Sequence, residues 1–163
     1  MKTTHVRRLS AIIAILLALA LLLVSCKEYA EPLFLMREFC KSYGVDSVVF
    51  SPSVKEGEDG YTDSSFFESV WSDGEELVES YAVFFLSNLN TAGECALFLC
   101  YSESDAITAA EILTRRIELI RSLGSAIDSS FCTDAFVMKS GRYVVMCALG
   151  DNERAREIWE RLV

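Results

Sequence analysis

The feature that most restricts the fold is a set of short segments in which nearly every residue is apolar. Residues 81–86, 95–101 and 143–149 have the aromatic, aliphatic and β-branched composition of strands, and 135–138 form a shorter fourth candidate. An antiparallel sheet with one wet face should alternate apolar and polar residues, whereas these segments do not. We therefore expect a sheet that is covered on both faces.

A long amphipathic helix separates the second and third predicted strands. Apolar residues recur at helical spacing from Ala106 to Ile120, Ser104 or Asp105 can cap the N-terminus, and Gly124 suits the C-terminal stop. The pattern predicts one face of this helix on the sheet.

The end of the chain repeats this arrangement. A tight turn at Ser140 and Gly141 can join the last two strands as a hairpin, and Asp151 can cap a final helix over 153–162. The order strand, strand, helix, strand, strand, helix predicts an α+β domain with a four-stranded, mainly antiparallel sheet and helices packed on it.

The segment before the first strand has weaker signals. Pro32 and Gly44 bracket a short amphipathic helix, 45–50 could be a short strand, 51–65 has the composition of a mobile loop, and 66–71 suggest an aromatic helix. We expect the two helices that follow the strands to cover one face of the sheet. The first helix and the aromatic segment would then cover the other.

The N-terminus has the layout of an export signal. Lys2, Arg7 and Arg8 precede an uncharged stretch over 9–25 whose apolar part, 11–24, falls short of the roughly 18 residues that a membrane-spanning helix needs. A membrane span is the less favoured alternative.

The end of this segment resembles the lipobox of bacterial lipoproteins, in the sequence Leu23-Val24-Ser25-Cys26. The resemblance implies that residues 1–25 are a cleaved signal peptide. Lipid on Cys26 would then hold the mature chain on the extracytoplasmic face of the cell membrane, because two or three acyl chains make a durable anchor. The alternative is an ordinary secretory signal in which Cys26 is incidental.

Removal of residues 1–25 from the 163-residue chain would leave 138 residues, a length that suits one compact domain. In it, 26–72 supply the N-terminal helix, the loop and the aromatic segment, and 73–163 form the α+β domain. The mature chain has 12 basic against 24 acidic residues, a formal charge of −12, which argues against nucleic acid as a partner.

Residue types exclude several kinds of catalysis. The single histidine, His5, lies in the predicted signal peptide, so the mature chain has no imidazole for a Ser-His-Asp or Cys-His system or a His-ligated zinc. The cysteines after Cys26 are odd in number and cannot all pair within one chain, so either one thiol stays free or the cell lives where oxygen is scarce. The absence of a C-x-x-C motif argues against thioredoxin-type redox chemistry and zinc ribbons. Buried apolar packing is the favoured interpretation, and a thiol-based redox or metal role is the alternative. These cysteines are Cys40, Cys95, Cys100, Cys132 and Cys147.

Acidic residues offer a further candidate site. Asp73, Glu75, Glu76 and Glu79 could supply the carboxylate pair of a hydrolase, although a capped first turn or a solvated face explains such a cluster more simply. The segment 56–63 has carboxylates beside glycines but lacks the spacing of a calcium loop. We expect no metal site and no cofactor.

Basic residues on the long helix have an ordinary interpretation. Arg115, Arg116 and Arg121 are interleaved with Glu111 and Glu118, so we expect ion pairs along the helix surface. The chain contains no Gly-rich phosphate loop, dinucleotide fingerprint or nucleophile elbow.

The segment 76–159 resembles an uncharacterised family of lipoproteins from Gram-positive anaerobes, the domain of unknown function 4358. The resemblance lies in 79–84, 94–98, the helix 105–116 with its Ala-Ala and Arg-Arg pairs, and 141–145. It implies tethering to the cell surface and the same small α+β domain, but it supplies no activity and no catalytic residue. The five further cysteines and the aromatic segment depart from the family pattern.

The sequence thus favours a non-catalytic module, tethered at the cell envelope, that binds a protein or a small ligand. The membrane would be contacted through the lipid on Cys26, and an envelope protein is a possible partner. The alternatives are an envelope hydrolase that uses carboxylates and a thiol-based redox or metal-binding lipoprotein.

Overall fold

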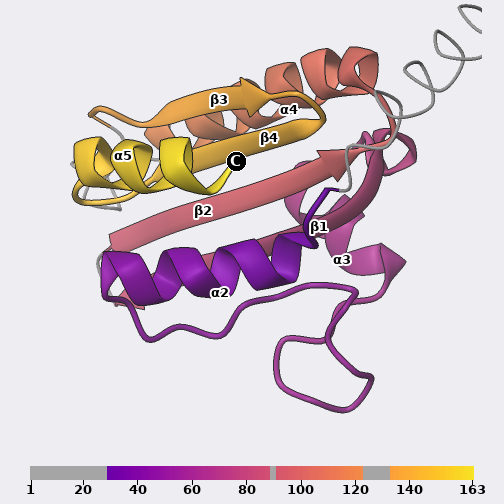
Figure 1. Ribbon diagram of the computed structural model, residues 1–163, viewed down its shortest axis with the longest axis horizontal. Coiled ribbons are helices and arrows are strands. Elements are labelled where there is room, and N and C mark those ends of the chain that lie inside the picture. Colours follow the sequence, from indigo (N-terminus) through magenta and orange to yellow (C-terminus); the bar gives the residue numbers. More distant parts are fainter. Residues whose placement is uncertain (1–28, 89–90, 123–132) are drawn as a thin grey trace, which may run out of the picture. The chain divides into compact units, whose positions relative to one another are not determined.

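The computed structural model describes residues 29–88, 91–122 and 133–163. A four-stranded sheet with the strand order β1-β2-β4-β3 organises the unit Glu31–Val163 (Figure 1). Each pair of neighbouring strands is antiparallel. The predicted α+β class and the predicted order of strands and helices are confirmed.

The first hairpin is longer than the sequence indicated. β1 (Val78–Asn88) pairs with β2 (Thr91–Cys100), so the hairpin extends past the predicted strand ends at 86 and 95, and its ladder includes the pair Phe85 and Glu94. Glu94 carries a charge, yet it is buried in the sheet beside a cationic partner described below. Backbone pairing therefore extends well past the apolar core of each strand.

The second hairpin inserts its last strand into the middle of the sheet. β3 (Phe136–Ser140) and β4 (Tyr143–Ala148) meet at the predicted turn, where Gly141 has a φ of 58°. That positive φ favours glycine, because other side chains clash there. β4 then pairs with β2, so the two hairpins form one continuous sheet.

The long helix begins with a cap that the sequence analysis misplaced. α4 spans Glu103–Ser122, and the hydroxyl of Ser102 accepts a hydrogen bond from the backbone N–H of Asp105 at 3.1 Å. Ser102 also donates to the Asp105 carboxylate at 2.6 Å, so neither Ser104 nor Asp105 is the N-cap. Several Ser and Asp residues in a row make such positions ambiguous. The predicted stop at Gly124 lies outside the described residues.

The first and last helices agree with their predicted caps. α2 (Pro32–Tyr43) has proline in its first turn and ends at Gly44, whose φ is 83° and whose N–H donates to a carbonyl of the last turn. α5 (Asn152–Leu162) is capped by Asp151, which accepts from the backbone N–H of Arg154 at 3.0 Å. The C-terminus of α2 and the N-terminus of α5 therefore lie where neighbouring residues satisfy the free backbone groups of the helix.

The chain between α2 and α3 does not form the predicted strand and pairs with the sheet at a single residue. Within the predicted strand 45–50, Phe50 alone pairs, through an isolated antiparallel bridge to Val83 on the outer edge of β1. The strand prediction was wrong because the chain leaves that edge directly after the bridge. α3 (Ser64–Trp71) and a short 3-10 turn, η1 (Glu75–Leu77), then lead into β1.

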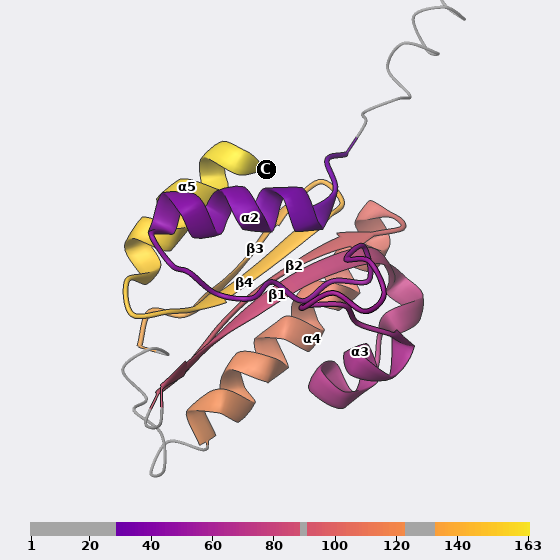
Figure 2. The ribbon, with the colours of Figure 1, turned by 90° about the horizontal axis from the view of Figure 1, so that it is seen from below.

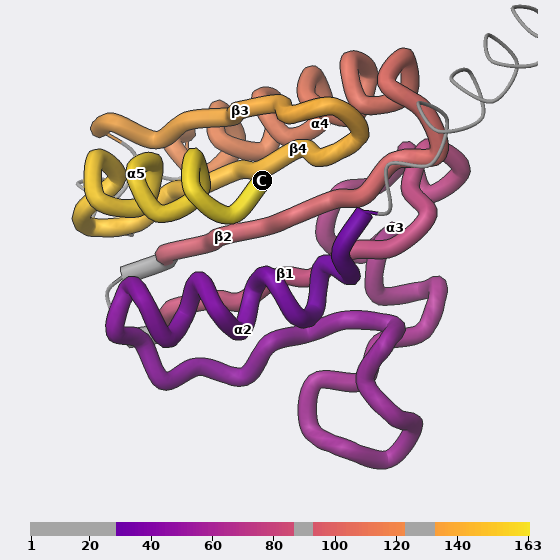
Figure 3. Tube along the Cα trace, in the orientation of Figure 1, coloured from indigo at the N-terminus to yellow at the C-terminus, as the bar shows by residue number. Residues whose placement is uncertain are grey.

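The predicted mobile loop over 51–65 folds back on itself (Figure 3). Ser51 donates its N–H to the carbonyl of Gly60 at 2.9 Å, and the side chains of Ser51, Val54 and Thr62 are buried. Gly60 has a φ of 92°, and a Cβ there would overlap the carbonyl oxygen of Val49. A glycine is therefore required where the loop returns to its starting point.

Both faces of the sheet are covered, as the apolar strands predicted, but the helices are distributed differently (Figure 2). α3 and α4 pack on one face, and α2 and α5 pack together on the other. There, Phe39 of α2 stacks on Trp159 of α5 with ring centroids 4.7 Å apart. The expectation that α4 and α5 share a face was wrong, since an apolar stripe shows that a helix packs but not on which face.

Candidate functional site

A hollow of about 430 Å³ opens beside the start of β1, and we call it the β1 hollow. Its volume lies within the range of ligand sites in proteins. The 51–63 loop, the start of α3, η1, β1 and the end of β2 supply its walls. The lining residues are Pro52, Tyr61, Thr62, Asp63, Ser64, Phe67, Glu75, Val78, Glu79, Ser80, Tyr81 and Tyr101.

The floor of the β1 hollow is a rigid aromatic cluster. Tyr81 contacts Phe67 and Trp71 edge-on, with ring centroids 5.3 and 5.6 Å apart. The Tyr81 hydroxyl donates to Thr62 Oγ1 at 2.9 Å, which ties the loop to the strand, and burial raises the pKa of this tyrosine. These contacts hold the Tyr81 side chain between α3 and the loop, and so fix the base of the hollow.

The rim carries two exposed tyrosines. Tyr61 is 40% exposed and Tyr101 is 58% exposed, although both border a well-packed core. The backbone N–H of Tyr101 donates to the carbonyl of Leu77 at 3.1 Å, which fixes its main chain against η1. Exposed aromatic rings at a concave surface present both an apolar area and a polar hydroxyl to a ligand.

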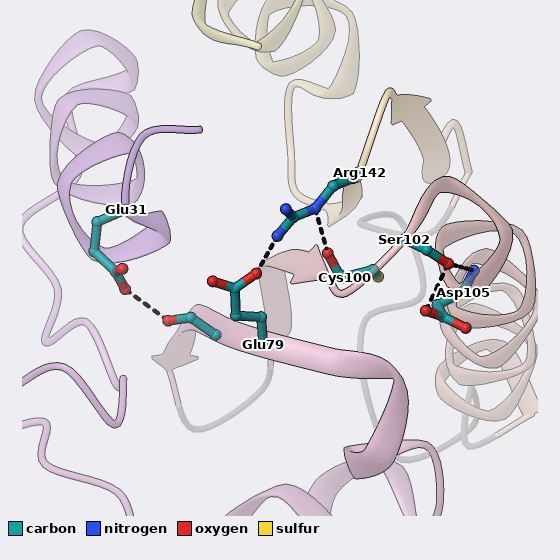
Figure 4. A network of polar contacts seen from close by, with 7 residues as sticks. Glu31, Glu79, Cys100, Ser102, Asp105 and Arg142 are labelled. Carbon is teal, nitrogen blue, oxygen red and sulfur yellow. Dashed lines mark hydrogen bonds and ion pairs between the residues drawn. The ribbon is translucent and has the colours of Figure 1, made fainter. Parts of the chain in front are cut away.

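Three carboxylates line the hollow, and only one of them is paired with an arginine. Asp63 caps α3, and its hydrogen bonds with Ser65 lower the pKa of the carboxyl. Glu79 pairs with Arg142, whose Nε also donates to the Cys100 carbonyl at 2.7 Å (Figure 4). Glu75, the third carboxylate, is exposed to solvent. The hollow therefore favours cationic groups.

Along the hollow, no described segment forms a backbone hydrogen bond with the outer edge of β1 beyond a single bridge, and in this sense we call the edge uncovered. Phe50 and Val83 exchange both backbone hydrogen bonds, at 2.7 and 2.9 Å, so the peptide groups of alternate residues, Val83 and Tyr81, point to this edge. In register, Pro52 would come opposite Tyr81, but proline has no N–H to donate. The ladder therefore stops at one bridge, and the edge beside Tyr81 lines the hollow.

The predicted acidic cluster is divided among different surroundings. Glu75 and Glu79 line the β1 hollow, whereas Asp73 lies 3.8 Å from Arg115 of α4. Asp73, Glu75 and Glu76 also border a separate shallow depression. Within the described ranges, no group of three or more potential ligand side chains could hold a metal ion. Clustering in sequence thus identified two of the hollow's carboxylates and missed Asp63.

Arg115 and Arg116 of α4 pair with acidic residues outside the helix, not with the predicted partners along it. Arg116 turns toward the sheet, where its Nη2 and Nε donate to Glu94 Oε2 at 2.8 and 3.0 Å. Glu94 is 3% exposed; burial raises the pKa of its carboxyl, and Arg116 opposes that shift. This is a buried ion pair between helix and sheet, not a surface pair along the helix, and no local pattern indicated it.

The cysteines in the described part of the chain are buried thiols, as the favoured interpretation predicted. Burial raises the pKa of Cys40 to about 11 and that of Cys100 to about 12. Cys95 and Cys147 lie opposite each other on β2 and β4 with their Sγ atoms 3.1 Å apart. Their approach depends on the register of the sheet, which no motif predicted.

The predicted signal peptide, the lipobox and its Cys26, and also Cys132, lie outside the described residues. In the part that is described, no helix is both long enough and apolar enough to cross a bilayer.

Comparisons with protein-family models, with curated proteins and with solved structures found no match. The similarity of 76–159 to a lipoprotein family stays a prediction from the sequence.

Proposed function

We propose that this chain is a lipoprotein of the extracytoplasmic face of the cell membrane that acts as a non-catalytic binding module at the envelope. The support for its location is the basic and apolar N-terminus followed by Leu23-Val24-Ser25-Cys26. The resemblance to a lipoprotein family points the same way. Lipid on Cys26 is the membrane contact in this proposal, and nucleic acid is not a partner.

The proposed binding site is the β1 hollow, and the proposed ligand is an extended peptide segment with cationic side chains. The observation that carries this proposal is the uncovered edge of β1 where it lines an acidic hollow. An extended peptide can add to such an edge as a further strand, because the backbone groups of the edge supply hydrogen bonds and neighbouring pockets select side chains.

The shape and charge of the hollow support the same ligand. Asp63 and Glu75 provide negative charge on its wall, since Glu79 is already paired with Arg142, while Tyr61 and Tyr101 on the rim can contact the apolar stems of lysine or arginine. The mature chain has a formal charge of −12, which also favours encounter with a cationic partner.

Isothermal titration calorimetry with synthetic peptides tests this proposal. The probe is a seven-residue peptide of alternating lysine and valine, and the comparison peptide has glutamate in place of lysine. A third peptide carries N-methyl groups on alternate residues, which removes the backbone N–H donors along one side of the extended peptide. We expect binding by the first peptide alone, and equal binding by all three would refute strand addition.

Variants locate the binding site. Glu75→Gln should weaken binding of the lysine peptide about two- to fivefold, as an exposed charge pair does, and Tyr101→Ala should weaken it further. Glu111→Gln on the outer surface of α4 removes the same charge elsewhere and should leave the affinity unchanged. An equal effect of Glu75→Gln and Glu111→Gln would place the binding outside the β1 hollow.

Membrane fractionation tests the anchor separately. The full chain should remain with the membrane after a high-salt wash, and Cys26→Ala should be released or should keep an uncleaved N-terminus. Crosslinking on intact cells with the anchored form would then identify envelope proteins that contact the module. Retention of Cys26→Ala with a normally processed N-terminus would contradict lipid anchoring at this cysteine.

A carboxylate hydrolase is the second candidate, favoured by one observation. Glu75 and Glu79 line the same hollow, and glycoside hydrolysis uses two carboxyl groups across a bond. Turnover of envelope polysaccharide by the wild type that is lost in both Glu75→Gln and Glu79→Gln would support this candidate. Absence of turnover, with peptide binding intact, would leave the binding module.

A further inference from the structure

The sulfur atoms of Cys95 and Cys147 are in contact on one face of the sheet. Their Sγ atoms lie 3.1 Å apart, and both residues are completely buried. They are 52 positions apart in the sequence, so the register between β2 and β4 brings them together. Nothing in the proposed binding site uses them, because they do not line the β1 hollow.

The backbone geometry of this pair suits a disulfide. The backbone N–H of Cys100 donates to the carbonyl of Arg142, its opposite residue, at 3.0 Å, which makes that pair a hydrogen-bonded one. Such pairs alternate along an antiparallel ladder, so Cys95 and Cys147, five positions along, form a non-hydrogen-bonded pair. The Cα atoms in such pairs are roughly 4.5 Å apart, within the range that disulfides span.

We propose that Cys95 and Cys147 are an oxidation site, where an intramolecular disulfide joins β2 to β4 in the exported protein. The inference rests on the export that the proposed function includes, but not on the β1 hollow, because the pair lies in the centre of the sheet. The oxidant is an external disulfide, either a small molecule or an exported thiol-disulfide protein.

The exchange takes place in two balanced steps. The thiolate of one cysteine attacks a sulfur of the external disulfide, which forms a mixed disulfide and releases one thiol. The second cysteine then attacks the sulfur of the first, which forms the Cys95–Cys147 bond and releases the second thiol. The pair loses two electrons and two protons, and the external disulfide gains them.

The timing of this exchange follows from burial. Cys95 has no exposed surface, and burial together with the neighbouring Cys147 raises the pKa of its thiol, so the folded chain contains little thiolate there. Oxidation therefore takes place after β2 and β4 have paired and before the helices cover them, while the newly exported chain folds. Once the helices α2 and α5 cover this face, the bond is shielded from reductants.

Differential alkylation and mass spectrometry test the proposal on the full chain isolated from membranes, and on the same chain refolded from urea with oxidised glutathione. Free thiols are blocked in denaturant with one reagent, and thiols released by reduction are labelled with a second. We expect the second label on Cys95 and Cys147 and the first on Cys40 and Cys100. The first label on Cys95 and Cys147 in the chain isolated from membranes, or a bridge from either to another cysteine in either sample, would overturn the proposal.

Thermal unfolding provides a second measurement. The refolded, oxidised chain should have a Tm about 5–15 °C above that of the chain reduced in urea and refolded without oxidant. The double variant Cys95→Ala/Cys147→Ala should lose this redox-dependent shift, whereas Cys100→Ala should keep it even if its own Tm is lower. A shift that survives in the double variant would assign the effect to other cysteines.

Discussion

Replacement of Arg116 by methionine probes the ion pair that joins α4 to the sheet. Methionine keeps most of the apolar stem and removes the guanidinium, so Glu94 loses its hydrogen bonds of 2.8, 3.0 and 3.3 Å. The Glu94 side chain is 4% exposed, and water cannot replace that partner without opening the interface.

Removal of either charged residue should lower the free energy of unfolding, but by different amounts. A buried carboxylate left without its cation costs about 3–5 kcal/mol, which we expect for Arg116→Met at neutral pH. Glu94→Gln leaves an arginine whose side chain is 24% exposed and can reach water, so we expect about 1–3 kcal/mol. The double variant should cost about 1–3 kcal/mol less than the sum of the single changes.

Urea unfolding followed by circular dichroism measures these differences, provided that the m value is unchanged among the variants. A loss below about 1 kcal/mol for Arg116→Met, with the same m value, would refute the reasoning, because that is the worth of an exposed surface pair. Equal losses for the two single variants would also contradict the predicted asymmetry.

The same pair makes a prediction for pH. Burial raises the pKa of Glu94 from its ordinary value of 4.5, so its contribution to stability is fully present below the unfolded pKa and is lost as pH rises through the folded pKa. Loss of Arg116 removes the opposing cation and raises the folded pKa further. The difference in unfolding free energy between wild type and Arg116→Met should therefore be smaller at pH 5 than at pH 8.

Three further substitutions test the core, the loop and a helix cap. Phe39→Ala removes a fully buried ring stacked on the indole of α5 and should cost about 3–5 kcal/mol in urea unfolding, with α2 detaching first. Gly60→Ala should cost about 1–3 kcal/mol, because its positive φ and the nearby Val49 carbonyl leave no room for Cβ, and a neutral result would contradict the loop geometry. Ser102→Ala should lower the unfolding free energy by about 1 kcal/mol, whereas Ser104→Ala should not, and the reverse order would restore Ser104 as the cap.

Local sequence signals predicted the elements but not their assembly. Composition located the strands, and Pro32, Gly44 and Asp151 located helix ends, because each depends on neighbouring residues alone. The faces on which α4 and α5 pack depend on contacts between distant segments, which a periodic pattern does not encode. The extension of β2 through Glu94 was missed for a related reason, since its partner Arg116 comes from another element.

The candidate site was predictable only in part. Glu75 and Glu79 were identified by their charge, while Tyr61, Tyr101 and the uncovered edge of β1 come together through the fold of the 51–63 loop. Proline at position 52 is a local signal that an edge pairing stops, but its partner strand was not known from the sequence.

Amide hydrogen exchange measured by nuclear magnetic resonance tests the central claim most directly. Titration with the lysine-valine peptide should slow exchange at Tyr81, whose peptide group faces the outer edge of β1. Ala82 pairs with Leu97 inside the sheet and should show no such change, so it serves as an internal control. Unchanged exchange at Tyr81 when the peptide saturates the protein, or protection confined to α4, would contradict a peptide-binding edge at the β1 hollow.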